Sequence, residues 1–313
     1  MITPKAYLAQ IPNEERVAMT ARSTTVGLLH LSVHSGLAVL LGLLIGLGVP
    51  GWPILLPIQG VVLVFLFTLQ HECTHKTPFA QDWLCAVIGH TVGVVILLPF
   101  HWFRAFHFAH HRWTNQPGLD PELEGPEIDT WPRWILHVSG LPYWTGMVGV
   151  LIRLAFGREQ QSWLPANAQR RAEREARIYF LVYFCAGVSL FLSPLLLWVW
   201  LVPVVLGQPF LRLYLLAEHG DCPKVQNMFQ NTRTTFTSRW LRTLAWNMPY
   251  HTEHHVWPSV PFHKLPDLHA SMKSHLCQTE DGYLAFNRAF LARRLNPEPV
   301  RDMPLVKEDG KVK

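Results

Sequence analysis

Long stretches without charged side chains constrain the fold of this chain more than any other feature. Residues 23–71 contain no Lys, Arg, Asp or Glu, and neither do residues 178–211, 83–103 and 134–152. A transmembrane helix needs about 20 mostly apolar residues, whereas the helices of a soluble protein carry a charged face. Only 16% of all residues are charged. The pattern therefore favours helices in a bilayer over helices in a large soluble core.

We expect an all-α integral membrane protein with about four transmembrane helices. The first uncharged run holds two spans around the Val-Pro-Gly-Trp-Pro turn at residues 49–53. The expected spans cover residues 26–48, 53–70, 178–196 and 198–217. The two shorter runs, at residues 83–103 and 134–152, are predicted to form interfacial or re-entrant helices. Residues 1–313 then make one domain, with a catalytic cap from 71–177 and 218–313.

Histidine is the second unusual feature, because the chain has 17 histidines and eight of them fall into three spaced groups. These groups are HECTH (His71, His75), HFAHH (His107, His110, His111) and HTEHH (His251, His254, His255). Residues three and four apart share one face of a helix, so each group points its imidazoles in one direction. Convergent neutral imidazoles are ligands for Zn, Cu, Fe and Ni. The three groups predict two metal ions, or one metal ion with several histidines left unused. The simpler alternative is that these are surface histidines that share this spacing by chance.

With these motifs and the flanking stretches FRAFHFAHHRWT and NMPYHTEHHVWPSVPFHKLP, the chain resembles the membrane fatty acid desaturase and hydroxylase superfamily. The family carries three histidine boxes, HxxxH, HxxHH and HxxHH, and the likeness covers about residues 24–290. It implies two non-haem iron ions with O2 as co-substrate. The implied ligands are the eight box histidines and His219, which follows the last apolar run. The matching position for an Asn that holds an iron-bound water in some acyl-CoA desaturases is Leu215, so that role is not carried over.

The resemblance also implies a topology, because the boxes meet at one site on the cytosolic side. An even number of crossings must then separate consecutive boxes, which agrees with interfacial helices at residues 83–103 and 134–152. Arg153, Arg158 and the arginines of residues 170–177 fall on the same side as the boxes, as the positive-inside rule requires. Residues 1–22 lack the apolar core of a secretory signal. We expect a multi-pass protein of the bacterial inner membrane with its active site facing the cytoplasm.

Carboxylates beside the boxes are candidates for orienting the ligands, because metal-bound histidine usually donates its other N–H to such a group. The candidates are Glu72, Glu218, Glu253 and Asp120; the alternative for each is a solvated charge. His30 and His34 form a separate i, i+4 pair inside the first span. An interhelical hydrogen bond is the expected role for this pair, and lining a substrate passage is the alternative.

The implied function is the O2-dependent desaturation of an acyl chain or lipid at an unactivated C–H pair. The chain contains no CxxC pair and no cytochrome b5-like haem motif, and its GxGxxG string at residues 46–51 lies in the apolar turn between two expected spans rather than between a strand and a helix. A separate donor must therefore bring electrons: ferredoxin, rubredoxin or a cytochrome b5-type carrier with its reductase. The basic residues 170–177 would suit an acidic carrier.

Three other functions are weighed against desaturation. A hydroxylase or monooxygenase acting on an alkane, carotenoid or similar lipid would use the same di-iron site, and the ligands do not separate these outcomes. A membrane zinc hydrolase needs fewer ligands and a nucleophile motif. A metal transporter would place its histidines inside the spans, whereas here they follow the spans. The formal charge of +5 is assigned to the cytosolic face rather than to nucleic acid.

Overall fold

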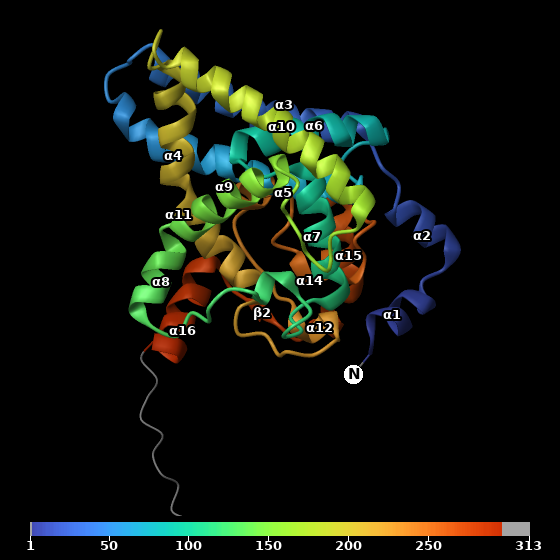
Figure 1. Ribbon diagram of the computed structural model, residues 1–313. Coiled ribbons are helices and arrows are strands. Elements are labelled where there is room, and N and C mark those ends of the chain that lie inside the picture. The colour runs from blue at the N-terminus through green and yellow to red at the C-terminus, as the bar shows by residue number, and fades with distance from the viewer. Residues whose placement is uncertain (1, 296–313) are drawn as a thin grey trace, which may run out of the picture.

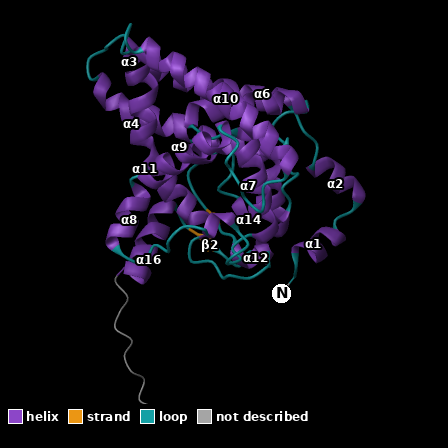
Figure 2. Ribbon diagram, in the orientation of Figure 1, coloured by secondary structure: helices purple, strands orange, loops and turns teal. Residues whose placement is uncertain are grey.

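The computed structural model describes residues 2–295. Helices make up nearly all of its regular structure (Figure 2). Residues 296–313, which belong to the expected cap, lie outside the described part. The helices through the first two boxes are α1 (Pro4–Gln10), α2 (Asn13–Met19), α3 (Thr24–Gly46), α4 (Trp52–Val64), α5 (Leu66–His75), α6 (Asp82–Ile96) and α7 (Phe100–Trp113).

The rest of the described chain runs from the middle helices into a cap of short elements. A 3-10 turn (Pro121–Leu123) precedes α8 (Trp131–Val138), α9 (Leu141–Ala155), α10 (Ala166–Ser189), a π-helical turn (Leu197–Leu201) and α11 (Val202–His219). The cap then contains α12 (Met228–Asn231), α13 (Arg239–Leu244), α14 (His251–Val256), α15 (Leu265–Met272) and α16 (Tyr283–Leu295). Its two short strands, β1 (Thr234–Thr235) and β2 (Thr279–Glu280), pair in parallel.

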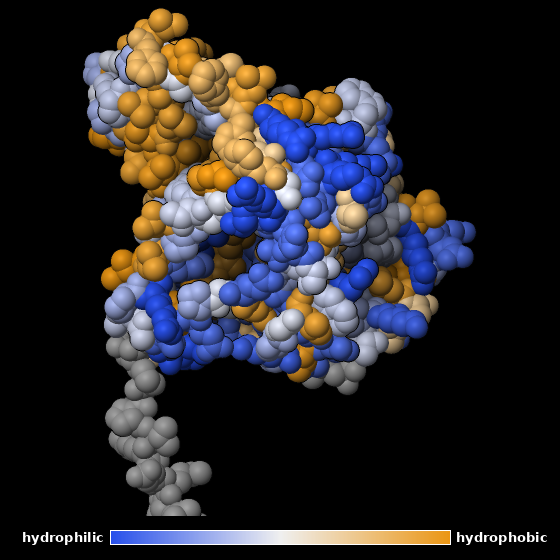
Figure 3. Space-filling model, in the orientation of Figure 1, coloured by the Kyte–Doolittle hydropathy of each residue, from blue (hydrophilic) through white to orange (hydrophobic). Residues whose placement is uncertain are grey.

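Three helical segments are long and apolar enough to cross a membrane: Asn13–Gly46, Trp52–His75 and Leu197–His219. Many apolar side chains of Asn13–Gly46 face outward, and Leu29 and Val33 of α3 are 67% and 58% exposed, whereas Trp52–His75 is more than half buried. These residues gather over the α3–α4 end of the molecule, while polar residues cover the opposite end (Figures 1 and 3). Apolar side chains exposed in this way are stable in lipid but costly in water. The chain is therefore a membrane protein.

The two shorter uncharged runs form bent pairs of helices. The axes of α6 and α7 differ by 98°, and those of α8 and α9 by 58°. If each pair crossed the bilayer, the number of spans would rise from three to five, a range that includes the expected four. The 98° bend between α6 and α7 is compatible with the expected interfacial or re-entrant segment.

The helix at the third expected span differs from the expected range. It begins at Ala166 and ends at Ser189, rather than covering residues 178–196. A turn at residues 190–194 separates it from the next helical segment, because Pro194 disfavours a helical conformation at the residue before it. The first half of α10 is charged, so only its second half resembles a span.

A close backbone contact holds α4 against α11. A Cβ atom at Gly60 would lie 2.2 Å from the Pro203 carbonyl oxygen, and one at Gly207 would lie 2.3 Å from the Gly60 backbone. Small residues allow membrane helices to approach in this way. Because α4 continues into α5, the contact places the carboxyl ends of α5 and α11 on the same side of the molecule. Both of these ends carry histidines.

Hydrogen bonds from α3 connect the first span to its neighbours. His34 Nε2 pairs with the Val62 carbonyl of α4 at 2.8 Å, and Trp246 Nε1 donates to His34 Nδ1 at 3.2 Å. His30 Nε2 pairs with the Thr243 carbonyl at 2.7 Å. The expected interhelical hydrogen bond is confirmed for both residues, because Val62 belongs to α4 and Thr243 to α13 of the cap.

Candidate metal centre

The first box lies at the end of α5, where a membrane helix meets the cap. His71 and His75 are one helical turn apart on that helix. The helix ends at His75 because the next residue, Lys76, has a left-handed backbone with φ of 63°. Thr77 then turns back and its hydroxyl donates to the Glu72 carboxylate at 2.7 Å. The turn fixes the end of the helix that carries both imidazoles.

The second box lies on α7, and a distant carboxylate caps the amino terminus of this helix. Glu175 of α10 accepts hydrogen bonds from the backbone N–H groups of Phe100 and His101 at 2.7 and 2.8 Å. An anion is stabilised at a helix amino terminus by the unpaired N–H groups and the helix dipole. The cap fixes where α7 starts, and so where His107, His110 and His111 lie.

The third box forms α14, a short and fully buried helix of the cap. His251 is its first residue, and Thr252 anchors the helix by donating to the Thr232 carbonyl at 2.9 Å. His219 is the last residue of α11 and reaches the same region. Its Nδ1 pairs with the Asn231 carbonyl at 3.1 Å, so its Nε2 faces the box histidines.

These elements bring the histidines into two compact groups. In each group the candidate ligand atoms lie within 4.8 Å of one another. The five-histidine group contains His71, His75, His107, His111 and His254. The three-histidine group contains His110, His219 and His255. His111 and His255 stack with ring centroids 4.1 Å apart and an interplanar angle of 7°, so the two groups adjoin.

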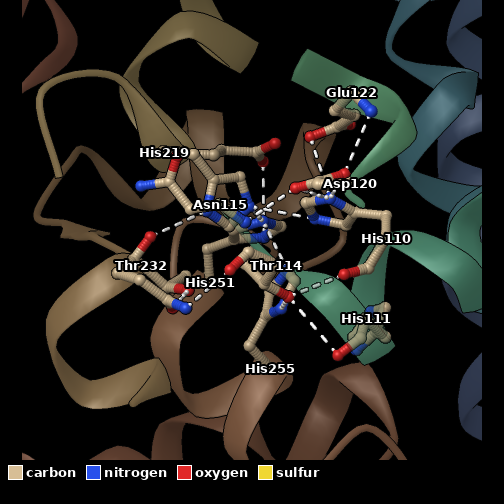
Figure 4. A network of polar contacts seen from close by, with 12 residues as sticks. His110, His111, Thr114, Asn115, Asp120, Glu122, His219, Thr232, His251 and His255 are labelled. Atoms are coloured by element: carbon tan, nitrogen blue, oxygen red, sulfur yellow. Dashed lines mark hydrogen bonds and ion pairs between the residues drawn. The ribbon is translucent and has the colours of Figure 1, made fainter. Parts of the chain in front are cut away.

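His251 contacts the three-histidine group. Its Nε2 lies 3.1 Å from Nε2 of both His219 and His255, and His219 Nε2 is 3.2 Å from His110 Nε2 (Figure 4). In the five-histidine group, His254 Nε2 lies 3.2 Å from His111 Nε2. The Nε2 atoms therefore point toward common centres, as the ligands of a metal do.

The chemistry of this donor set fits metal ions. Burial, followed by the neighbouring imidazoles, lowers the pKa of His251, His254 and His255 well below its usual range, so these rings are neutral and keep a lone pair. Both ring nitrogens of His71 are buried without a hydrogen-bond partner. Such orphaned polar atoms are costly, and a metal ion would satisfy one of them.

Three of the four expected carboxylates lie next to ring nitrogens of the two groups. Asp120 accepts from His110 Nδ1 at 3.0 Å (Figure 4), Glu218 lies 3.5 Å from His251 Nδ1, and Glu72 lies 3.8 Å from His254 Nδ1. The hydrogen bond between His110 Nδ1 and Asp120 orients that ring and leaves its Nε2 for a metal. Nδ1 of His251 and Nδ1 of His254 lie near a carboxyl group but have no hydrogen-bond partner among the described residues.

Glu253 differs from the expectation. Its carboxylate accepts from Thr234 Oγ1 at 2.6 Å and pairs with His269 Nδ1 at 2.5 Å, outside both histidine groups. The reason is helical geometry, since Glu253 and His254 are adjacent and point in different directions. It holds α14 against β1 and α15 instead.

Glu122, a further carboxylate beside the second box in the sequence, lies 3.2 Å from His110 Nδ1. No sequence signal pointed to Thr114. Thr114 Oγ1 pairs with His255 Nδ1 at 3.2 Å, across 141 positions of the chain.

Comparison with known proteins agrees with this geometry. The family model for fatty acid desaturases matches residues 50–287. The sn-1 oleoyl-lipid 12-desaturase of Picosynechococcus sp. is 23% identical over 73% of this chain and 72% of its own length. The sn-1 acyl-lipid omega-3 desaturase (ferredoxin) of Nostoc sp. is 23% identical over 68% and 62%. The chloroplastic omega-3 fatty acid desaturase of Glycine max is 24% identical over 68% and 52%. The chain belongs to the fatty acid desaturase family.

Proposed function

We propose that this protein is an O2-dependent desaturase that introduces a double bond into the acyl chain of a lipid. The observation that carries the proposal is the convergence of the nine expected histidines into two adjoining groups, with His71, His75 and His219 at the ends of apolar helices. The relatives support desaturation rather than hydroxylation, because their names specify acyl-lipid and fatty acid desaturases.

We assign one non-haem iron ion to each histidine group, with His251 joining the three-histidine group. Imidazole suits several transition metals, and iron is the one that the reaction requires. Two iron ions held here would supply the reductive activation of O2 that breaking an unactivated C–H bond demands. In the balanced reaction, a CH2–CH2 unit, O2, two electrons and two protons give a CH=CH unit and two waters.

The protein's own residues contribute position and environment. Asp120 holds the ring of His110 in the orientation that presents Nε2, and Glu218 lies 3.5 Å from Nδ1 of His251. Two of the apolar segments end at the histidine groups, so under this proposal the site faces the boundary of the bilayer, where acyl chains are available as substrate. His251 and His254 of α14 are buried, which limits the contact of bulk water with these two ligands.

The electrons come from a separate carrier under this proposal. Ferredoxin is the leading candidate because the name of the Nostoc relative specifies it; rubredoxin and a cytochrome b5-type carrier with its reductase are the alternatives. We further propose that the chain crosses the bacterial inner membrane about four times, with the histidine groups on the cytoplasmic side.

Metal analysis of anaerobically purified protein tests the site. We expect about two Fe per chain, and His110→Ala and His254→Ala should lower the iron content and abolish product formation. His263→Ala is the matched control, because His263 lies outside both groups, and it should retain both. One Zn with no Fe would contradict the proposal.

Product analysis tests the reaction. Purified protein in lipid, supplied with O2, ferredoxin and its reductase, should yield an unsaturated acyl chain detected by mass spectrometry. An alcohol as the sole product would assign the protein to the hydroxylases instead.

A further inference from the structure

One cavity opens from the surface onto both histidine groups. Its volume is about 620 Å³, and its lining includes His111 of the five-histidine group and His255 of the three-histidine group. These are the two stacked rings, and His255 is only 1% exposed. It therefore lies at the bottom of the cavity. A molecule seated here would approach both metal positions at once.

A second cavity lies on the other side of Arg112, which lines both. Its volume is about 600 Å³, and its lining includes Phe108, which is 42% exposed. The Phe108 ring lies 5.5 Å from the His75 ring, and Arg104 Nε donates to the Thr74 carbonyl at 2.8 Å. One aromatic ring thus separates this cavity from the five-histidine group. We call the combined lining of the two cavities the Arg112 surface.

The Arg112 surface carries positive charge only. The two linings contain Lys5, Arg16, Arg104, Arg112 and Arg171, and neither includes an Asp or Glu. Lys5 and Arg112 are exposed, and their side chains make no hydrogen bond or ion pair within residues 2–295. Unpaired cations around a concave surface attract an acidic partner and accelerate its association.

The position of this surface favours a partner from the aqueous phase. The α1 helix, which supplies Lys5, lies at the cap end of the molecule, far from the apolar turn between α3 and α4 (Figures 1 and 3). A lipid substrate would instead approach from the side of the spans. The surface meets the two needs of electron delivery, which are access from water and a short path to the metals.

We propose that the Arg112 surface is the docking site of a small acidic iron–sulfur carrier, a ferredoxin, and that electrons enter through His111, His255 and Phe108. The proposal rests on the proposed function, since it requires metal ions in the histidine groups. Two reduced ferredoxins each lose one electron and become oxidised. The two electrons, with two protons and O2, account for one double bond and two waters.

Binding of oxidised plant-type [2Fe–2S] ferredoxin to the full-length protein in nanodiscs tests the docking site. The double variant Lys5→Glu/Arg112→Glu should raise the Kd at least about tenfold, through a slower and less salt-dependent association. The matched control is Arg239→Glu/Lys264→Glu, with the same charge change at two cations outside both cavities. It should bind like the wild type. Equal affinity of all three proteins, or no binding by the wild type, would overturn the proposal.

Chemical reduction separates this proposal from the proposed function. Dithionite with methyl viologen should support equal alkene formation in the wild type and the docking variant, whereas ferredoxin should reduce only the wild type efficiently. If the wild type forms no alkene with either reductant, the proposed function fails, while the binding result still decides the docking site. If the variant loses binding to phosphatidylglycerol vesicles but keeps its affinity for ferredoxin, the surface contacts the membrane and the docking proposal is wrong.

Discussion

The carboxylate of Glu175 should control the stability of the helix that carries the second histidine box. Its side chain is 4% exposed and accepts from two backbone N–H groups at the start of α7, while Oε1 also pairs with His90 Nδ1 at 2.6 Å. Glu175→Gln preserves the size of the side chain but removes the charge and one of the two acceptor oxygens. The new amide N–H would face the backbone N–H groups of Phe100 or His101.

The expected cost follows from these contacts. A hydrogen bond to a charged group contributes about 1.5–3 kcal/mol, and a carboxylate at a partly buried helix amino terminus up to about 2 kcal/mol. Because one neutral acceptor remains, we expect Glu175→Gln to lower the free energy of unfolding by about 2–4 kcal/mol.

Thermal unfolding in detergent, followed at one scan rate, measures this effect. The matched control is Glu173→Gln on the same helix, because within residues 2–295 the Glu173 side chain accepts a hydrogen bond only from the side chain of Gln169, at 3.0 Å. This control should change the free energy of unfolding by less than about 0.5 kcal/mol. Equal unfolding midpoints for Glu175→Gln and Glu173→Gln would refute the capping role.

Two further predictions concern helix packing and the metal centre. Gly207→Ala places a Cβ 2.3 Å from the backbone of Gly60 and should destabilise the protein by about 1–3 kcal/mol; Gly36→Ala, with no atom within 4 Å of the added Cβ, should not. The comparison of their thermal unfolding midpoints checks this. Asp120→Asn weakens the contact that orients His110, so the metal affinity of the protein should fall about 10- to 100-fold. Competition with a chelator measures this affinity. An unchanged affinity would contradict an orienting role for Asp120.

The sequence predicts the apolar helices and the histidine groups because both depend on local spacing. A run such as residues 23–71 has no charged residue to place in water, and His71 and His75 share a helix face wherever that helix lies. Partners that are distant in the chain could not be predicted in this way. The pairing of Glu175 with the start of α7 depends on how α10 crosses α7, which composition does not encode.

The same limit explains the two differences at the carboxylates and spans. Glu253 is beside a box in sequence, but the direction of its side chain on α14 takes it to His269. The expected third span was centred on an uncharged run, whereas the helix continues back through charged residues to Ala166. Charge patterning marks where a chain is apolar, and hydrogen bonding and turns decide where each helix begins and ends.

The adjacent histidines at the end of each HxxHH box divide between the two groups. His111 and His254 belong to the five-histidine group, whereas their neighbours His110 and His255 belong to the other. Successive residues on an α-helix are rotated by about 100°, so one rigid turn presents a ligand to each group. If each group holds one iron, His255→Ala should remove about half of the iron and leave the five-histidine site occupied. The ratio of iron to protein tests this division. His254→Ala, which changes the other group, should likewise lose about one of the two iron ions. If His255→Ala instead lost both iron ions, the two groups would bind metal as a single unit.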